Sequence, residues 1–204
     1  MSKLVIPRKA VYRLSLYQRA LQRLRENHIP TVSSAALAKA AGVKPTQLRK
    51  DLAYFGQFGT RGLGYDVDAL SAKLTEVLGT TKLQPVILVG VGNLGSALLH
   101  YQGFAREGFE IAAAFDVAPQ KRKTMPVPLL PMKYLEDFVK KRSIKMAILA
   151  VPGTAAQEAT NLLVGLGVQG ILNFSPIILQ VPDGVVVNNV DLAIELENLS
   201  YFIR

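Results

Sequence analysis

The chain has 204 residues, half of them hydrophobic, with no cysteine and with 24 Lys and Arg against 15 Asp and Glu, a formal net charge of +9. This composition suits one large or two small globular domains and argues against a mainly disordered chain. The lack of cysteine excludes disulfides, thiol redox centres and thiolate metal sites, and no apolar run approaches the roughly 20 residues of a membrane-spanning helix.

The excess positive charge lies in the first part of the chain. Residues 1–84 hold 14 Lys and Arg against five Asp and Glu, whereas residues 85–204 hold ten of each. A local excess suggests a polyanion as the partner of this first segment, although an inert basic surface would give the same count.

Neither a metal site nor export is expected. The two histidines, His28 and His100, lie in different segments, and neither has a second ligand at metal-binding spacing. The first residues lack the apolar stretch of a signal peptide, so we expect a cytoplasmic protein without a membrane segment.

The first predicted element is an amphipathic helix. Apolar residues recur at spacings of three and four from Val11 to Leu24, which places them on one face. Pro7 lies near its start, where a missing N–H is tolerated, and Pro30 excludes an unbroken continuation. Arginines, Arg19 among them, occupy much of the remaining surface.

A helix-turn-helix pattern comes next. Ser33-Ser34 offers an N-cap for a helix over 35–41, and Gly42 ends that helix. Pro45 then opens a second helix that runs to about Tyr54.

The second helix of this pair carries the candidate base-reading side chains. Gln47, Arg49 and Lys50 lie between the apolar positions and are available on other faces. Arginine and lysine can donate to guanine edges or phosphates, and glutamine can pair with adenine. The alternative is an ordinary amphipathic helix with a solvated basic face.

The segment from Phe55 to Tyr65 holds four glycines, several aromatic residues and Arg61. It is typical of a β-hairpin or wing. A wing beside a helix-turn-helix can place Arg61 on a phosphate or in the minor groove, and we add Gly62 and Tyr65 to the candidate DNA interface. A purely structural glycine-rich turn is the alternative.

The composition changes near residue 80, where Gly79-Thr80-Thr81-Lys82 is the natural linker. Before it the chain is basic and helical; after it short β-branched runs alternate with helical patterns. We therefore predict an α/β protein with a winged-helix domain over 1–80, a Rossmann-type parallel sheet domain over 81–189, and a C-terminal helix over 190–204.

The second domain opens with a dinucleotide-binding pattern. The apolar run over 86–89 predicts a buried strand, and Gly90-Val91-Gly92-Asn93-Leu94-Gly95 follows it at once. Gly90 permits the tight turn, Gly92 lets the backbone approach a pyrophosphate, and Gly95 lets the next helix pack near the strand. The helix N-terminus adds N–H donors for the phosphates.

Asp116 completes this pattern, because it ends the following strand and can accept hydrogen bonds from the ribose hydroxyls. The carboxylate favours NAD over NADP, since it would repel a 2′-phosphate. Lys121-Arg122-Lys123 argues the other way, and we interpret it as a solvated loop.

Further strands and helices alternate to the end of the domain. We predict a helix over 134–142, a strand over 145–151, a helix to Leu166 that opens with a capping box at Thr154–Gln157, and strands over 170–173 and 185–189. Residues at strand ends should line the crevice where such sheets bind ligands, although loop packing would explain them as well. They are Val151, Pro152, Asn173 and Phe174.

Several segments of the chain resemble motifs of the bacterial Rex redox-sensing transcriptional repressors. They are Gln47-Leu48-Arg49-Lys50-Asp51-Leu52 with Phe55-Gly56, Gly59–Tyr65, Gly90–Gly95, Gly170–Phe174 with Pro176, and Asn189–Leu192. The resemblance covers nearly the whole chain. It implies a homodimer that exchanges its C-terminal helix, binds double-stranded inverted-repeat operators, and releases them when NADH rises relative to NAD.

By position, the resemblance assigns Gln47, Arg49, Lys50 and Arg61 to DNA contacts, and Gly90–Gly95 with Asp116 to the dinucleotide. It also places Tyr101 near the nicotinamide. An Arg–Asp pair that exists in one state only could couple the two sites, and Arg19, Tyr101 and Asp191 are the candidate switch residues.

Two other functions compete with the repressor. One is an NAD-dependent dehydrogenase with a basic appendage. His100 is the single histidine of the second domain and lacks an evident acid partner, so we expect no catalytic residue. The other is a CoA-binding Rossmann module, which should bind CoA and ignore NADH.

Overall fold

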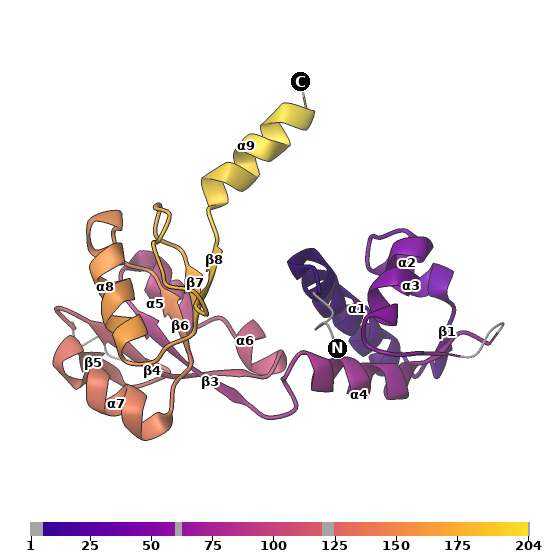
Figure 1. The fold of residues 1–204 in the computed structure, drawn as a ribbon, viewed down its shortest axis with the longest axis horizontal. Coiled ribbons are helices and arrows are strands. Elements are labelled where there is room, and N and C mark those ends of the chain that lie inside the picture. Colours follow the sequence, from indigo (N-terminus) through magenta and orange to yellow (C-terminus); the bar gives the residue numbers. More distant parts are fainter. Residues whose placement is uncertain (1–5, 60–62, 120–124, 204) are drawn as a thin grey trace. The chain divides into compact units, whose positions relative to one another are not determined.

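Residues 6–59, 63–119 and 125–203 are described by the computed structural model, which divides the chain into two units, residues 1–82 and 83–204. Each unit has its own hydrophobic core, and each is described by itself (Figure 1).

The described residues of unit 1 form four helices and a small two-stranded sheet. Its elements are α1 (Arg8–Glu26), β1 (Thr31–Val32), α2 (Ser34–Ala40), α3 (Pro45–Ala53), β2 (Tyr65–Asp66) and α4 (Val67–Val77). The two strands are antiparallel and pair Val32 with Tyr65, so β2 lies beside the strand that precedes α2. This is the predicted winged helix-turn-helix.

Local chemistry explains the boundaries of these helices. The Ser33 hydroxyl accepts a hydrogen bond from the Ala36 N–H at 3.1 Å and caps α2. Gly42 has φ of +68°, the left-handed conformation that ends many helices, and Pro45 is in the first turn of α3. These three expectations from the sequence are confirmed.

The buried face of α1 differs slightly from the predicted one. Leu14, Tyr17 and Leu21 are buried as expected, whereas Val11 is 41% exposed. The face turns toward Gln18, whose amide nitrogen donates to the hydroxyl groups of Ser71 and Thr75 on α4 at 3.1 and 3.0 Å. The apolar spacing alone does not reveal these hydrogen bonds between α1 and α4.

Unit 2 is built on a six-stranded parallel sheet with strand order β5-β4-β3-β6-β7-β8. Its elements are β3 (Gln84–Val89), α5 (Asn93–Leu99), α6 (Gly103–Arg106), β4 (Phe109–Asp116), β5 (Leu129–Pro131), η1 (Met132–Tyr134), α7 (Leu135–Arg142), β6 (Met146–Leu149), α8 (Gly153–Gly165), β7 (Gly170–Asn173), β8 (Val186–Asn189) and α9 (Leu192–Phe202).

The strands alternate their side chains between two cores. Ile87 and Val89 of β3 face a core that includes residues of α7 and α8, and Val86 and Leu88 face a core that includes Leu99 at the end of α5. The direction of the chain across the sheet reverses between β3 and β6. In a doubly wound sheet, ligands bind outside the carboxyl ends of the strands at this reversal, which places the glycine loop at the expected position.

The predicted capping box at the start of α8 is wrong. The helix begins at Gly153 with Pro152 as its N-cap, two residues before the predicted N-cap at Thr154. Gln157 instead forms two hydrogen bonds with the main chain of Gln180, one as donor and one as acceptor, both at 2.9 Å. A partner distant in sequence outcompetes the local cap.

The C-terminal helix α9 has no buried residue along its described length and leads away from the sheet of its own unit (Figure 1). Leu196 and Leu199 are 67% and 61% exposed. Among the described residues, no helix is both long enough and apolar enough to cross a membrane.

Candidate functional sites

Two of the three glycines of the loop after β3 are required by packing. Gly90 has φ of +95°, and a Cβ there would lie 2.6 Å from the carbonyl oxygen of Ala150 at the end of β6. A Cβ on Gly95 would overlap the carbonyl oxygen of Gly90. Gly90 therefore lets β3 and β6 approach each other, and Gly95 lets α5 pack against the loop.

Gly92 differs from its two neighbours, because a Cβ there would meet no described atom within 4 Å and its φ is an ordinary −73°. Neither packing nor backbone conformation requires this glycine. An open space above the loop is what a phosphate group would need if it is to approach the main chain. The glycine pattern therefore fits a dinucleotide better than a structural turn.

Asp116 lies directly beside this loop. Its carboxylate accepts hydrogen bonds from the Val91 N–H at 2.7 Å and from the Ala118 N–H at 2.9 Å. Each oxygen thus accepts from one main-chain donor, and an ionised carboxylate offers about four acceptor positions. The side chain is half-buried, so it shapes the loop and still has acceptor capacity for a ligand.

The predicted rim of the crevice is partly structural. The sequence predicts that Asn173 contacts a ligand, but its side chain is fully buried. Its amide nitrogen donates to the carbonyls of Ser175 and Ile177 and to Asn189 Oδ1, and its oxygen accepts from the Ser175 N–H. These hydrogen bonds hold the turn after β7 and join it to Asn189 at the end of β8, so this prediction is corrected to a structural role.

The other rim residues surround that turn. Val151 is half-buried at the end of β6, and its carbonyl accepts a hydrogen bond from the Ser175 hydroxyl at 2.7 Å. Pro152 is exposed, and Phe174 is half-buried against the core on the α5 side. Sequence reasoning misses Ser175, because nothing separates it from an ordinary turn serine.

Tyr101 follows α5 and is 60% exposed. Its ring packs edge-to-face on Phe104 with centroids 5.1 Å apart, and it covers Gly103, where a Cβ would overlap it. The ring is therefore held in place by α6 and is largely exposed, so it can be contacted by a ligand or a partner.

The proposed DNA-reading side chains of α3 fall into two groups. Arg49 and Lys50 are exposed, and Arg49 Nη1 donates to the Ser34 hydroxyl at 3.1 Å, which steadies it beside α2. Gln47 is half-buried, and its amide nitrogen donates to Asp51 Oδ1 at 2.8 Å. Arg61 and Gly62 lie outside the residues that the structure describes.

Tyr65 differs from its predicted role. Its side chain is only 7% exposed and belongs to the core of unit 1, where it packs under Gly59 of the wing. Burial raises the pKa of its hydroxyl, and the nearby Arg49 offsets part of that shift. Tyr65 therefore packs in the core beneath Gly59, and we remove it from the candidate DNA interface.

Asp51 is a second residue that sequence reasoning misses. It is buried in α3 and accepts hydrogen bonds from Arg13 Nε and Nη2 at 2.5 and 2.7 Å, from the Tyr17 hydroxyl at 2.7 Å, and from Gln47. A signal exists, because Asp51 follows Leu48 by three residues and precedes Leu52 by one, on the apolar side of the helix. A charged residue there needs partners.

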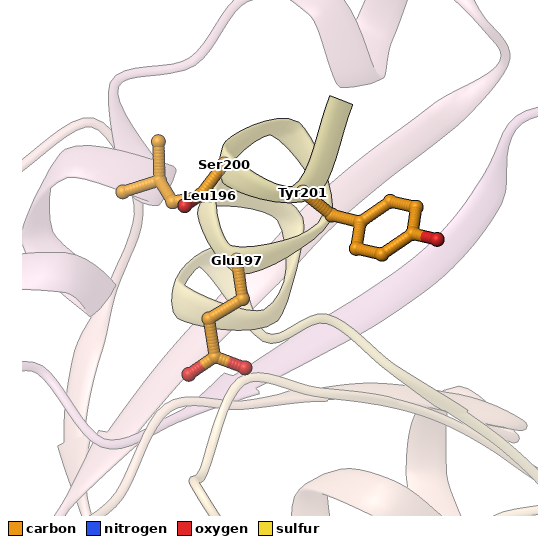
Figure 2. A pocket seen from close by; sticks show the side chains of 4 residues that line it. All are labelled: Leu196, Glu197, Ser200 and Tyr201. Atoms are coloured by element: carbon orange, nitrogen blue, oxygen red, sulfur yellow. The ribbon is translucent and has the colours of Figure 1, made fainter. Parts of the chain in front are cut away.

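The tail of the chain offers an apolar surface. Asp191 caps α9, and its carboxylate accepts from the N–H groups of Ala193 and Ile194 at 2.9 and 3.3 Å. Leu196, Glu197, Ser200 and Tyr201 line a pocket, and Figure 2 shows that all four project from this one helix. Arg19, another candidate switch residue, is exposed on α1.

The described residues contain no group of three or more His, Asp or Glu that could hold a metal ion.

Two family models match the chain. One, described as a putative DNA-binding protein N-terminus, matches residues 5–53, and the other, described as a CoA binding domain, matches residues 81–177. The first match lies within unit 1, and the second covers most of unit 2 and begins two residues before it.

Relatives similar over nearly the whole chain carry one name. The redox-sensing transcriptional repressor Rex of Syntrophobacter fumaroxidans is 46% identical over 199 residues, 96% of this chain and 95% of that protein. The protein of the same name from Carboxydothermus hydrogenoformans is 46% identical over 201 residues, 98% of this chain and 97% of that protein.

Solved structures give the same result. The crystal structure of RSP in complex with beta-NAD+ and operator DNA matches with a TM-score of 0.90 at 36% identity and covers 98% of this chain and 94% of that one. The crystal structure of RSP in complex with beta-NADH matches with a TM-score of 0.86 at 35% identity and covers 98% and 95%.

Proposed function

This chain belongs to the Rex family of redox-sensing transcriptional repressors, and we propose that it binds inverted-repeat operator DNA and releases it when NADH binds. The observation that supports this most directly is the presence, in one chain, of a winged helix-turn-helix with exposed Arg49 and Lys50 and of a glycine loop beside Asp116. The family is one of regulators, so a dehydrogenase activity is not part of the proposal.

In unit 1, α3 is the reading helix. Arg49 and Lys50 carry positive charge on its exposed side and can donate to guanine edges and phosphates, while Gln47 contributes an amide. Arg61 and Gly62 of the wing remain part of the proposed interface. Because phosphate contacts dominate affinity, binding should weaken steeply with salt, by about 0.9 in the log–log slope for each phosphate neutralised.

In unit 2, the loop from Gly90 to Gly95 would hold the pyrophosphate of NAD(H), and Asp116 would accept from the ribose hydroxyls. Val151, Pro152 and Phe174 would border the crevice, and the exposed ring of Tyr101 would contact the nicotinamide end. The dinucleotide acts as a sensed ligand, whose redox state supplies the signal.

The protein should act as a homodimer. The apolar side chains of α9 have no cover among the described residues of their own chain, and a second copy that exchanges the same helix would bury them on both sides. A dimer also matches an operator with two half-sites, since a two-fold protein reads an inverted repeat. A repressor works where the chromosome is, so we place it in the bacterial cytoplasm.

The switch requires that NADH bind a DNA-incompetent arrangement better than the DNA-competent one. Arg19 on α1, Tyr101 after α5 and Asp191 at the start of α9 are proposed to exchange partners between these arrangements. Asp191 caps α9 here, so a new partner for its carboxylate would also change the anchoring of that helix.

The test is a DNA-binding titration with the full chain. The wild-type protein first selects a duplex from a randomised inverted-repeat pool, and fluorescence anisotropy then follows binding as NADH, NAD+ or CoA is added. We expect release by NADH at concentrations where NAD+ and CoA leave the complex intact. Release by CoA, or by both dinucleotides equally, would contradict redox sensing.

The switch residues need their own variants. NADH-induced release should weaken in Asp191→Ala and Tyr101→Phe, while Glu158→Gln, an exposed change on α8, should behave as wild type. Unchanged release in both switch variants would remove these residues from the mechanism.

A further inference from the structure

We propose that Asp51 is a positioning residue for base recognition: it orients the Gln47 amide so that its oxygen is presented to the operator, and Gln47 thereby selects a base with an exocyclic amino group. This inference rests on the proposed DNA-binding function and adds a rule for one operator position.

The carboxylate of Asp51 is saturated with donors. Oδ2 accepts from Arg13 Nε and from the Tyr17 hydroxyl, and Oδ1 accepts from Arg13 Nη2 and Gln47 Nε2. Its side chain is 1% exposed. Four donors fill the four acceptor positions of an ionised carboxylate, so the group is held on all sides.

The network keeps Asp51 ionised. Burial by itself raises the pKa of Asp51, but the hydrogen bonds from Arg13, Tyr17 and Gln47 outweigh it and hold that pKa below its ordinary value. At neutral pH the carboxylate is therefore an acceptor only.

An ionised acceptor decides which way the neighbouring amide faces. The nitrogen of Gln47 is the donor that Asp51 can accept, and the amide oxygen would be repelled from the same position. The oxygen consequently turns away from the carboxylate, and it accepts no hydrogen bond from the residues that the structure describes. The orientation follows from charge and hydrogen bonding, and it removes the two-fold ambiguity of a free amide.

A fixed orientation has consequences for specificity. In the major groove, adenine N6 and cytosine N4 are donors, whereas guanine O6 and thymine O4 are acceptors. An oxygen held toward the bases can accept from an adenine or cytosine amino group, and it meets repulsion at guanine or thymine. A freely turning glutamine could adjust to either kind of base.

The experiment measures base preference at every position of the duplex selected by the wild-type protein. Each position is replaced by all four bases, and anisotropy gives affinities for wild type, Gln47→Leu, Asp51→Asn and Gln47→Glu. Asp68→Asn is the matched control, because Asp68 is an exposed carboxylate on α4 that pairs with Arg25 at 2.7 Å.

We expect one position where wild type prefers adenine or cytosine over guanine and thymine by about tenfold. The four-base comparison tells which of the two amino groups is read. Gln47→Leu and Asp51→Asn should both lose this preference to within about twofold and keep the preferences at all other positions. Asp68→Asn should keep them all.

Gln47→Glu tests the idea without altering the buried carboxylate, in case Asp51→Asn folds poorly. Its side chain carries oxygens and no donor, and the ionised Asp51 repels these oxygens toward the bases, so the preference for an amino-bearing base should survive at lower overall affinity. The proposal is overturned if Gln47→Glu loses the preference as Gln47→Leu does, or if Asp51→Asn weakens all duplexes equally with every preference intact. A wild-type protein that selects no duplex would overturn the proposed function itself.

Discussion

Each unit uses an aspartate to organise its functional segment, and the two carboxylates are used differently. Asp51 is buried and receives four hydrogen bonds from side chains, which joins the reading helix α3 to α1. Asp116 is half-buried and receives two from main-chain N–H groups, which sets the glycine loop. The first carboxylate is saturated, and the second retains acceptor capacity.

This difference separates positioning from binding. A saturated buried carboxylate can only hold its neighbours, so its removal should cost stability and precision. A carboxylate with unused lone pairs beside the glycine loop can also receive a ligand, so its removal should cost affinity and less stability than removal of the buried carboxylate.

The largest expected effect is the loss of stability on removing Asp51. Asp51→Ala leaves Arg13 and Tyr17 without their acceptor and should destabilise unit 1 by about 3 kcal/mol, toward the low end for buried pairs because the Arg13 side chain is 21% exposed. Hydrogen exchange of α1 and α3 measures this, and NADH affinity should stay unchanged. Asp68→Ala, at an exposed pair, is the control and should cost less than about 1 kcal/mol. Equal losses of stability in Asp51→Ala and Asp68→Ala would contradict the role assigned to Asp51 in joining α3 to α1.

A smaller loss is expected in the loop beside Asp116. Gly95→Ala drives a Cβ into the Gly90 carbonyl and should cost about 2 kcal/mol, whereas Gly92→Ala meets open space and should cost less than about 0.5 kcal/mol. Urea unfolding followed by circular dichroism compares the two. Gly92→Ala should nevertheless weaken NADH binding, because its methyl group occupies the space left for the phosphates. Normal NADH affinity in Gly92→Ala would argue against the pyrophosphate site proposed at this loop.

Asp116→Ala should separate binding from stability. Losing the hydrogen bonds to the ribose should weaken NADH binding about tenfold, which corresponds to about 1.4 kcal/mol. Calorimetric titration with NADH and NADPH is the measurement, and the preference for NADH over NADPH should shrink because the carboxylate no longer repels a 2′-phosphate. If the variant binds NADH and NADPH with wild-type affinities, the proposed contact between Asp116 and the ribose is contradicted.

The smallest effect is the pH dependence of unit 1. Because the folded pKa of Asp51 lies below its ordinary value of 3.8, its stabilisation is fully present above that pH and is lost as the pH falls below it. Urea midpoints between about pH 5 and pH 2.5 should therefore decline more steeply for wild type than for Asp51→Asn. Parallel declines would mean that the network does not hold the carboxylate ionised.

The sequence predicts the elements whose signals are local. The N-cap at Ser33, the turn at Gly42 and the glycine loop before α5 all depend on residues within a few positions of one another, and the structure has each of them. The winged helix and the Rossmann-type sheet follow from those signals, because strand, loop and helix alternate in a recognisable order.

The sequence cannot supply contacts between distant residues. Asp51 meets Arg13 across 38 positions, and Gln157 meets the Gln180 main chain across 23. Neither pair is visible to periodicity, which records only which face a residue occupies. The same limit explains why the sequence places Asn173 and Tyr65 at ligand sites, since strand ends and wings hold structural residues as well as binding ones.

Reciprocal linkage tests the central claim most directly, that one chain couples a dinucleotide site to a DNA site. The affinity of wild-type protein for NADH is measured by calorimetry with and without the selected operator duplex, and the affinity for the duplex is measured with and without NADH. Thermodynamic linkage requires the ratio of the affinity with the other ligand to the affinity without it to be the same in both experiments. We predict that this ratio is well below one for NADH and nearer one for NAD+. An NADH affinity unaffected by operator DNA would contradict the account.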